Sequence, residues 1–324
     1  MPDAASVRLE YLSVKDAGRP DGAFVVFASP EERCLGSARL FRDYKANVVC
    51  TLRITDEENE EREKNLERLR EFSRSVGNVV DCPVTHSDPV AGIADLVSIV
   101  AKTARDGGAV TVDVSTFPKN ALLLTLRALG QEPALHNLRL IYTEPGEYTR
   151  NLDVPLSYGL KRIGVVPTFA APYRANQELV LIMFLGYERD RALGIWQSIE
   201  PHRTIAVIPC PAYHPEWEGL TEHLNAALLA ALRNEDVYRV DPRTPFGAYN
   251  FLKKTVGTAV KAQAQNFYVA PLGTKPQTVG LACFCKQFPS AATVVYAAPL
   301  EHNHEYISKG IGPTWWLPCP KEDT

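Results

Sequence analysis

An internal repeat constrains this 324-residue chain more than any other feature of its sequence. A single offset of 158 positions places Thr116 on Thr274 and Pro118 on Pro276. The same offset superposes an Arg-x-Leu-Gly pattern and two apolar, strand-like segments, which are residues 33–36 on 191–194, 47–50 on 205–208, and 79–82 on 237–240. Because one offset serves successive elements of different types, we predict a tandem duplication of one α/β unit.

Within each copy, short apolar runs alternate with segments of helical length. Residues 179–184 read Leu-Val-Leu-Ile-Met-Phe, and such a continuous apolar run is typical of a strand that is buried on both faces. Strands that alternate with helices predict right-handed crossovers and a mostly parallel sheet with helices on both faces. We therefore predict an α/β chain of two tandemly duplicated Rossmann-like domains, residues 1–172 and 173–324, related by a pseudo-two-fold axis.

Local patterns predict several further elements. Glu and Arg recur at spacings of three and four in residues 56–76, which predicts an amphipathic helix with a solvated face. Residues 7–14 alternate as a strand does. The other expected elements are helices at residues 34–44 and 218–233, and an aromatic tail at residues 313–316 that covers a sheet edge.

Composition and charge limit the classes of partner. The chain is 45% apolar and 23% charged, as soluble globular proteins are, and its net charge of −3 gives no bulk attraction to duplex nucleic acid or an anionic membrane. Its longest apolar run, residues 179–185, is too short to span a bilayer, and the N-terminus has no apolar segment of a secretory signal. The seven cysteines are scattered without a Cys-x-x-Cys pair, which predicts reduced thiols and a cytoplasmic location.

One turn in the second copy has the character of an anion-binding site. Residues 267–270, Phe-Tyr-Val-Ala, predict a buried strand, and a Pro-Leu-Gly-Thr-Lys-Pro turn leads from it into an apolar helix at residues 277–285. Thr274 is a suitable N-cap, and Pro276 stands where the first helical turn tolerates proline. We expect open backbone N–H groups and Lys275 at this helix start to favour a phosphate or carboxylate. The alternative is an ordinary helix cap with a solvated lysine.

This strand–turn–helix unit, with its Gly273-Thr274-Lys275 turn, resembles the signature of the CARF family, the CRISPR-associated Rossmann-fold sensors of cyclic oligoadenylate. In that family a threonine and a lysine at the helix start contact the ligand, and two such domains face each other across a two-fold axis. The resemblance implies that Gly273, Thr274 and Lys275 contact a ligand, that a duplicated chain forms the pair internally, and that the protein acts in bacterial defence. The first copy departs from the pattern, because Ser115-Thr116-Phe117 lacks both the glycine and the lysine. A half-used, asymmetric site is therefore expected.

Ligands of open parallel sheets bind at the carboxyl ends of the strands. The loops expected there hold the remaining candidate binding residues, which are Glu188, Arg189, Asp190 and Arg191 in the second copy and Asp113 and Thr116 in the first. Carboxylates beside an arginine, as in the first crossover loop of each copy, indicate either an ion pair that shapes the loop or a contact for a ligand hydroxyl or ribose. Asp113 either serves as an acid or base, or forms a turn at its strand end.

The signatures of common enzyme classes are absent. The residues before Gly273 include no second glycine of a Walker A motif, and neither Gly-x-Gly-x-x-Gly after the first strand nor Gly-x-Ser-x-Gly occurs. His302 and His304 stand two residues apart, a spacing at which both can ligate one metal ion in an extended segment. No third ligand has a fixed spacing, so we expect a solvated loop there and assign no metal or cofactor.

Three functions stay open on these grounds. The first is a cytoplasmic sensor or regulator that binds a nucleotide, such as a cyclic or linear oligonucleotide, with a phosphate at residues 273–275. The second is a hydrolase or phosphoryl-transfer enzyme that uses Asp113, Glu31, Asp190 or the His302 and His304 pair. The third is a scaffold whose tandem sheets bind a protein partner in a larger complex.

Overall fold

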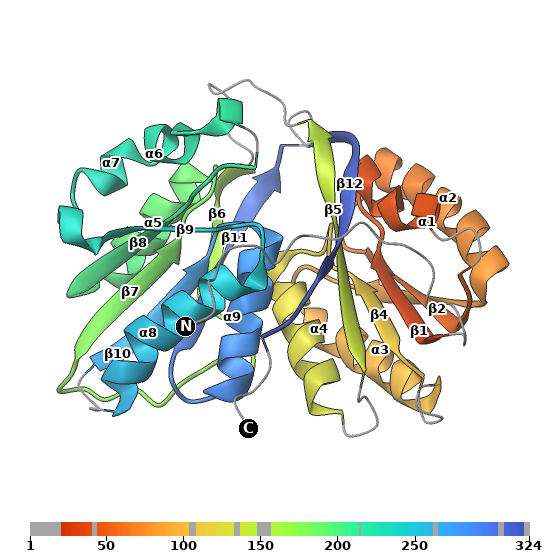
Figure 1. Cartoon of the computed structure of the whole chain (residues 1–324), viewed down its shortest axis with the longest axis horizontal. Helices are drawn as coiled ribbons and strands as arrows, with labels where there is room; N and C mark the ends of the chain where they lie inside the picture. The colour runs from red at the N-terminus through yellow and green to blue at the C-terminus, as the bar shows by residue number, and fades with distance from the viewer. Residues whose placement is uncertain are drawn as a thin grey trace, which may run out of the picture. The chain divides into compact units, whose positions relative to one another are not determined.

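The chain divides into two compact units, and its described residues form a six-stranded sheet in each (Figure 1). The computed structural model describes residues 21–40, 44–103, 108–132, 137–147, 157–213, 215–261, 265–303 and 308–320. The first unit comprises Met1–Phe117, Ala128–Tyr148 and Ser308–Pro318, and the second comprises Pro118–Arg127, Thr149–Ile307 and Cys319–Thr324. The predicted fold class, two mostly parallel Rossmann-like sheets with helices, is confirmed. The strand predicted at residues 7–14 lies outside the described residues.

The first sheet is built from β1 (Asp21–Phe27), β2 (Ala46–Ile54), β3 (Asn78–Val84), β4 (Val110–Asp113), β5 (Leu138–Glu147) and β12 (Lys309–Leu317). Their order across the sheet is β12-β5-β4-β1-β2-β3. All neighbours are parallel except β12, which pairs with β5 in antiparallel orientation. The helical segments of this part of the chain are the 3-10 helix η2 (Glu32–Leu35), α1 (Gly36–Leu40), α2 (Glu60–Val76), α3 (Pro89–Thr103) and α4 (Lys119–Gln131). The residues of α4 up to Arg127 belong to the second compact unit.

The second sheet is built from β6 (Ser157–Val165), β7 (Glu178–Phe184), β8 (Arg203–Pro209), β9 (Val237–Val240), β10 (Gln265–Pro271) and β11 (Thr293–His302). Their order is β6-β11-β10-β7-β8-β9, and only β6 is antiparallel to its neighbour. The helical segments here are α5 (Arg189–Ile199), η3 (Pro215–Trp217), α6 (Leu220–Leu224), α7 (Ala226–Leu229), η4 (Asn234–Asp236), α8 (Pro245–Lys261) and α9 (Lys275–Gln287).

The two sheets have the same strand order, with one exchange at their edges. The parallel strands β5-β4-β1-β2-β3 correspond in order to β11-β10-β7-β8-β9. The antiparallel edge strand β6 follows β5 along the chain but pairs with β11, while β12 follows β11 and pairs with β5. The structure therefore groups the chain differently from the linear halves 1–172 and 173–324. An edge strand offers one free row of N–H and C=O groups, and a strand pattern in the sequence does not say which sheet edge will complete it.

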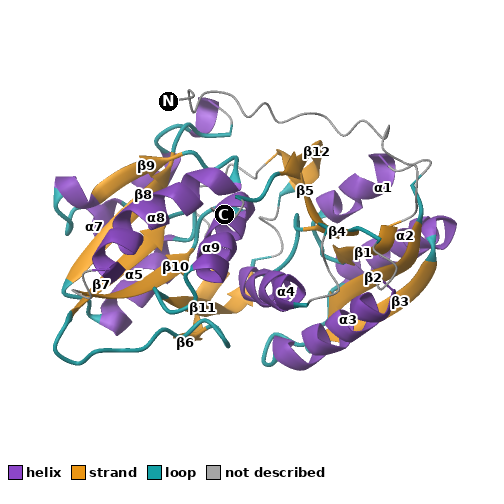
Figure 2. Ribbon diagram, turned by 60° about the horizontal axis from the view of Figure 1, so that its bottom comes forward, coloured by secondary structure: helices purple, strands orange, loops and turns teal. Residues whose placement is uncertain are grey.

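The central strands β7 and β8 of the second sheet are buried on both faces, as their continuous apolar sequence predicts. Leu181 and Met183 of β7 pack in one cluster with Ile195 of α5. The next residue, Phe184, meets Phe251 of α8 edge-on, with ring centroids 6.1 Å apart. Successive residues of one strand thus pack against different helices, and Figure 2 shows helices flanking each sheet.

Several helix boundaries differ from the sequence expectations. Asn59 caps α2 by accepting a hydrogen bond from the Arg62 N–H at 2.9 Å, so this helix begins later than residue 56. The segment predicted as a helix at residues 34–44 consists of η2 and α1, which ends at Leu40. The single helix predicted at residues 218–233 was wrong. Gly219 has a left-handed φ of 78°, and the Asn225 side chain donates to the Thr221 carbonyl at 2.8 Å, so short helical pieces replace it.

The aromatic tail covers a sheet edge, as expected. Trp315 and Trp316 lie in β12 and pair with Tyr142 and Ile141 of β5. Among the helices that the structure describes, none has both the length and the apolar character that a bilayer span requires.

Candidate functional site

One arrangement of an arginine, a carboxylate and a tyrosine occurs in both units. In the second unit, Arg191 pairs with Glu188, donates from Nη2 to the Ala297 carbonyl at 2.5 Å, and lies over the Tyr296 ring at 5.2 Å from its centroid. The Arg191 side chain is only 5% exposed. The ion-pair interpretation of Glu188 and Arg191 is therefore confirmed, whereas their contact with a ligand stays a prediction.

The first unit repeats this arrangement. Arg33 donates from Nε to Glu31 at 2.8 Å and from Nη1 to the Thr143 carbonyl at 3.4 Å, and it lies 5.8 Å from the centroid of the Tyr142 ring. The tyrosine and the carbonyl come from equivalent places in the two sheets, whereas the carboxylate stands two residues before the arginine in one unit and three before it in the other. The duplication therefore extends to the arginine and the tyrosine.

Arg189 and Asp190, the other two candidates of the second crossover loop, lie at the surface in the first turn of α5. Their side chains are 48% and 59% exposed and form an ion pair with each other at 3.4 Å. An exposed pair of this kind contributes little to stability, so both side chains can reorient toward a ligand. Their assignment as binding residues stays a prediction.

The turn after β10 is built as a reciprocal helix cap. The Thr274 hydroxyl accepts from the Gln277 N–H at 3.3 Å, and the Gln277 side-chain oxygen accepts from the Thr274 N–H at 3.0 Å. The Thr274 hydroxyl itself donates to the Pro242 carbonyl at 2.8 Å. Gly273 leaves room for this cap, because a Cβ there would lie 2.1 Å from the Gln277 side-chain oxygen.

This cap changes one expectation about the turn. The sequence predicted open backbone N–H groups at the start of α9, but those of Thr274 and Gln277 are bonded inside the cap, and Pro276 has none. The expectation of several open N–H groups was wrong, because the capping box satisfies the same donors that would otherwise face an anion. The positive charge at this turn comes from side chains.

Lys119 is the residue that the sequence did not connect with this turn. Its Nζ donates to the Leu272 carbonyl at 2.7 Å. Burial lowers the pKa of Lys119 well below its usual range, and the positive charges of Lys275 and Arg191 lower it further. Three cationic side chains therefore lie near one another at the carboxyl end of the second sheet. No spacing rule links Lys119 to Lys275, because the contact joins segments far apart in the chain.

Buried polar atoms near this turn have no hydrogen-bond partner within the described residues. They are the Gln277 side-chain nitrogen, Arg191 Nε and the Asn225 side-chain oxygen. Asn225 donates to the Gly186 carbonyl at 2.9 Å, and a Cβ on Gly186 would lie 2.4 Å from the Leu272 carbonyl oxygen, so this segment adjoins the turn. Buried polar atoms normally have partners, and a ligand or water at this place would supply them. Sequence reasoning missed Gln277 and Asn225.

Asp113 and Thr116 are both buried polar residues of the first unit, and the second Asp113 oxygen, Oδ2, has no hydrogen-bond partner among the described residues. Asp113 is 1% exposed and accepts from the Ser115 N–H at 3.0 Å and from the Ser115 hydroxyl, and burial raises its pKa. Ser115 Oγ in turn accepts from the Thr143 N–H at 2.7 Å. The Thr116 hydroxyl donates to the Phe27 carbonyl at 2.7 Å. The turn-forming interpretation of Asp113 is confirmed, because its side chain accepts from the N–H two residues on.

The histidine pair offers no metal site within the described residues. His302 ends β11, but its side chain and the whole of His304 lie outside them. In the part of the chain that the structure describes, no three His, Cys, Asp or Glu residues form a group that would hold a metal ion.

Comparison with known proteins adds little to this picture. No protein family and no curated protein matches the sequence. One similar structure is the cytoplasmic domain of a prokaryotic cation chloride cotransporter, at 11% identity over 89% of this chain and 100% of that chain, with a TM-score of 0.27. Another is UDP-GlcNAc 2-epimerase from Neisseria meningitidis bound to UDP-GlcNAc, at 11% identity over 79% of this chain and 80% of that chain, with a TM-score of 0.20. Likeness at this level carries no argument about function.

Proposed function

We propose that the second unit binds a phosphate-bearing small molecule of the nucleotide class at the turn after β10. The observation that carries the proposal is the position of Lys119, whose Nζ lies 2.7 Å from the Leu272 carbonyl and close to the charges of Lys275 and Arg191. Gathering like charges in a partly buried place is unfavourable. Glu188 already pairs with Arg191, and a phosphate at this turn would add negative charge beside Lys119 and Lys275.

The uncharged groups near the turn suit the remainder of a nucleotide. The Gln277 nitrogen and Arg191 Nε are donors and the Asn225 oxygen is an acceptor, and none has a partner among the described residues. A base edge or a ribose hydroxyl presents complementary acceptors and donors. Only the second copy contributes such a site. In the first copy Phe117 occupies the position equivalent to Lys275, which is the departure from the CARF pattern.

We infer from the resemblance of Gly273-Thr274-Lys275 that the protein is a sensor or regulator and that cyclic oligoadenylates are the first ligands to test. In such a role, binding at the turn changes how the protein engages a protein partner, as in bacterial defence systems that respond to these signals. Asp113 is closed off from solvent, which disfavours the alternative in which it acts as a catalytic acid or base.

Calorimetric titration tests the proposal. Cyclic and linear oligoadenylates, ATP and inorganic phosphate are titrated against the protein and against Lys275→Ala and Lys119→Met. Lys286→Ala is the matched control, because Lys286 is an exposed lysine in the last turn of the same helix. We expect at least one nucleotide to bind, tenfold or more weakly to the two site variants, and with unchanged affinity to the control. No binding by any of these compounds, or unchanged binding to Lys275→Ala, would refute the proposal.

A further inference from the structure

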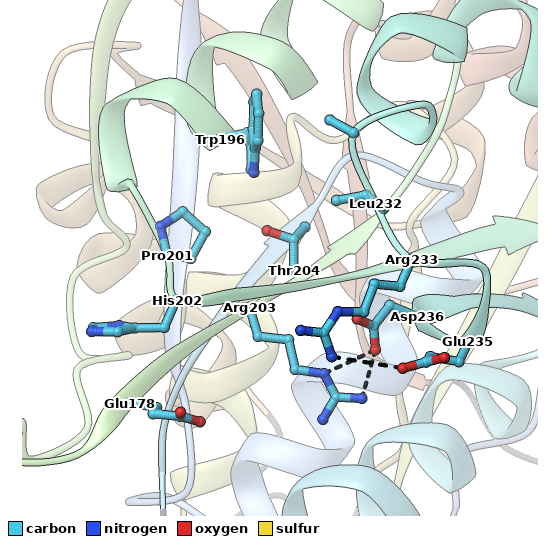
Figure 3. A pocket seen from close by; sticks show the side chains of 11 residues that line it. Glu178, Trp196, Pro201, His202, Arg203, Thr204, Leu232, Arg233, Glu235 and Asp236 are labelled. Atoms are coloured by element: carbon cyan, nitrogen blue, oxygen red, sulfur yellow. Dashed lines mark hydrogen bonds and ion pairs between the residues drawn. The ribbon is translucent and has the colours of Figure 1, made fainter.

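A cavity of about 480 Å³ lies in the second unit at the end of the sheet opposite the turn after β10 (Figure 3). Glu178 begins β7, Arg203 begins β8, and Asp236 directly precedes β9, so the cavity is at the amino ends of three parallel strands. Its volume is within the range of roughly 300–1,000 Å³ that is usual for small-molecule sites. It shares no residue with the proposed nucleotide site.

The rim of the cavity is held in one conformation. Helix α5 ends at Ile199, and Glu200 then takes a left-handed φ of 48°, which turns the chain. Beyond it, the His202 N–H donates to the Leu179 carbonyl at 3.0 Å, and the Leu179 N–H donates to His202 Nδ1 at 3.1 Å. Because Nδ1 is an acceptor, the neutral ring carries its proton on Nε2. This wall is therefore preformed.

Two guanidinium groups line the cavity, and each has a carboxylate partner. Arg203 donates from Nε at 2.9 Å and from Nη2 at 2.5 Å to one oxygen of Asp236, which is buried and is neutralised by this pair. The Arg233 side chain is 78% exposed and has Glu235 as a partner at 3.7 Å, a distance and exposure at which the pair is weak. Figure 3 shows the ion pairs of both arginines in the lining of the cavity. Within the described residues, Arg203 Nη1 has no hydrogen-bond acceptor.

An apolar surface faces these charges. The Trp196 indole and the Leu232 side chain lie above the arginines in Figure 3, with Thr204 between them. No described residue accepts a hydrogen bond from the Trp196 indole nitrogen, which points toward the Thr204 side of the cavity. A flat aromatic body on the indole would gain both burial and ring contacts.

Two further acidic residues, Glu178 and Glu235, line the cavity besides Asp236. Glu178 accepts from the Gln265 side chain at 3.3 Å and lies apart from the two guanidinium groups in Figure 3. The Glu235 side chain is 72% exposed, so water and salt screen its charge. Arginine prefers planar anions, because two parallel N–H groups match the two oxygens of a carboxylate.

From these contacts we infer that the cavity binds a small aromatic carboxylate. Its ring packs on Trp196 and Leu232, and its carboxylate accepts hydrogen bonds from Arg203 and Arg233. The site is independent of the proposed nucleotide site, so one can fail without the other.

Titration of 2-naphthoate, followed by ligand-observed NMR and calorimetry, tests this site. The matched neutral compound is 2-naphthamide, which keeps the ring and loses the charge. Arg233→Gln removes an exposed guanidinium and is not expected to affect folding. Arg239→Gln is the control, because Arg239 is also an exposed arginine with one carboxylate partner, Glu222 at 2.8 Å.

We expect 2-naphthoate to bind at least tenfold more tightly than 2-naphthamide, and at least tenfold more weakly to Arg233→Gln than to the unaltered protein or to Arg239→Gln. Trp196→Phe should also weaken binding, since phenylalanine has a smaller ring surface and lacks the indole N–H donor. The inference is overturned if 2-naphthoate does not bind, if the amide binds equally well, or if Arg233→Gln binds as the unaltered protein does.

Discussion

The turns that follow β4 and β10 are copies of one element, but they differ in the side chain at one equivalent position. Both keep a threonine and a proline in register, and both threonine hydroxyls donate to a carbonyl of a neighbouring loop or strand, that of Phe27 in one copy and of Pro242 in the other. Between them, the first copy has Phe117, which is fully buried against Phe27 at 4.9 Å between ring centroids. The second copy has Lys275. The first turn therefore adds the Phe117 ring to a hydrophobic core, whereas the second turn carries the positive charge of Lys275.

The arginine arrangement diverged much less than these turns. Arg33 and Arg191 keep a carboxylate partner, a tyrosine ring and a strand carbonyl in each unit. Because the arrangement is the same in a unit with and in a unit without a lysine at the turn, we conclude that its main role is to hold the crossover loop. A ligand contact of Arg191 would be an addition to this structural role.

The largest expected effect is the difference in stability between alanine variants at the two equivalent turn positions, 117 and 275. Phe117→Ala removes a fully buried ring, and such changes cost about 3–5 kcal/mol of unfolding free energy. Lys275→Ala should lower the unfolding free energy by less than Phe117→Ala does, because Lys275 is only half-buried and its truncation removes no ring from the hydrophobic core. Urea denaturation of both variants measures the difference. Equal losses in the two variants would show that the positions have not diverged in role.

A smaller effect is expected at Gly273. An alanine Cβ there would meet the Gln277 side-chain oxygen at 2.1 Å and break the reciprocal cap, and the loss of a cap costs about 0.5–2 kcal/mol. Gly257→Ala in α8 is the matched control, because its Cβ meets nothing within 4 Å. An alanine inside a helix stabilises by roughly 0.5–1 kcal/mol relative to glycine. Thermal unfolding should therefore shift in opposite directions for the two variants, and a shift in the same direction would argue against a cap that depends on Gly273.

The third effect is a change in the slope of the unfolding free energy with pH. The folded state lowers the pKa of Lys119, so below the unfolded value of about 10.4 the unfolded chain binds more protons than the native one. The unfolding free energy should then rise with pH in that window, by at most about 1.4 kcal/mol per pH unit for this group. In the second copy Gln277 occupies the position equivalent to Lys119. Its side chain does not titrate, so it adds nothing to this slope.

Lys119→Met removes the titrating group, so urea denaturation at pH 7.5, 8.5 and 9.5 should give a shallower slope than the unaltered protein. Lys286→Met is the control and should keep the original slope. Identical slopes for Lys119→Met and the unaltered protein would mean that Lys119 does not feel the charges of Lys275 and Arg191.

The sequence predicted the turn after β10 as a strand, a glycine turn and a capped helix, and each part is present because Thr274, Pro276 and Gln277 act within a few residues of one another. It did not predict that Gln277 would close the cap, since a glutamine at this place is equally compatible with a solvated side chain. The contact of Lys119 with Leu272 and the cavity around Trp196 and Arg203 had no sequence signal, because their members come from separate segments.

By itself, the sequence determined the duplication, the alternation of strands and helices, and the burial of the central strands on both faces. These properties follow from periodicity and local capping, which act along the chain. Only the tertiary structure decided that β6 and β12 exchange sheets, and that Lys119 joins the charges around Lys275. Edge pairing and the clustering of like charges depend on which segments meet in space, and neither the pattern of a strand nor the identity of a lysine specifies its partner.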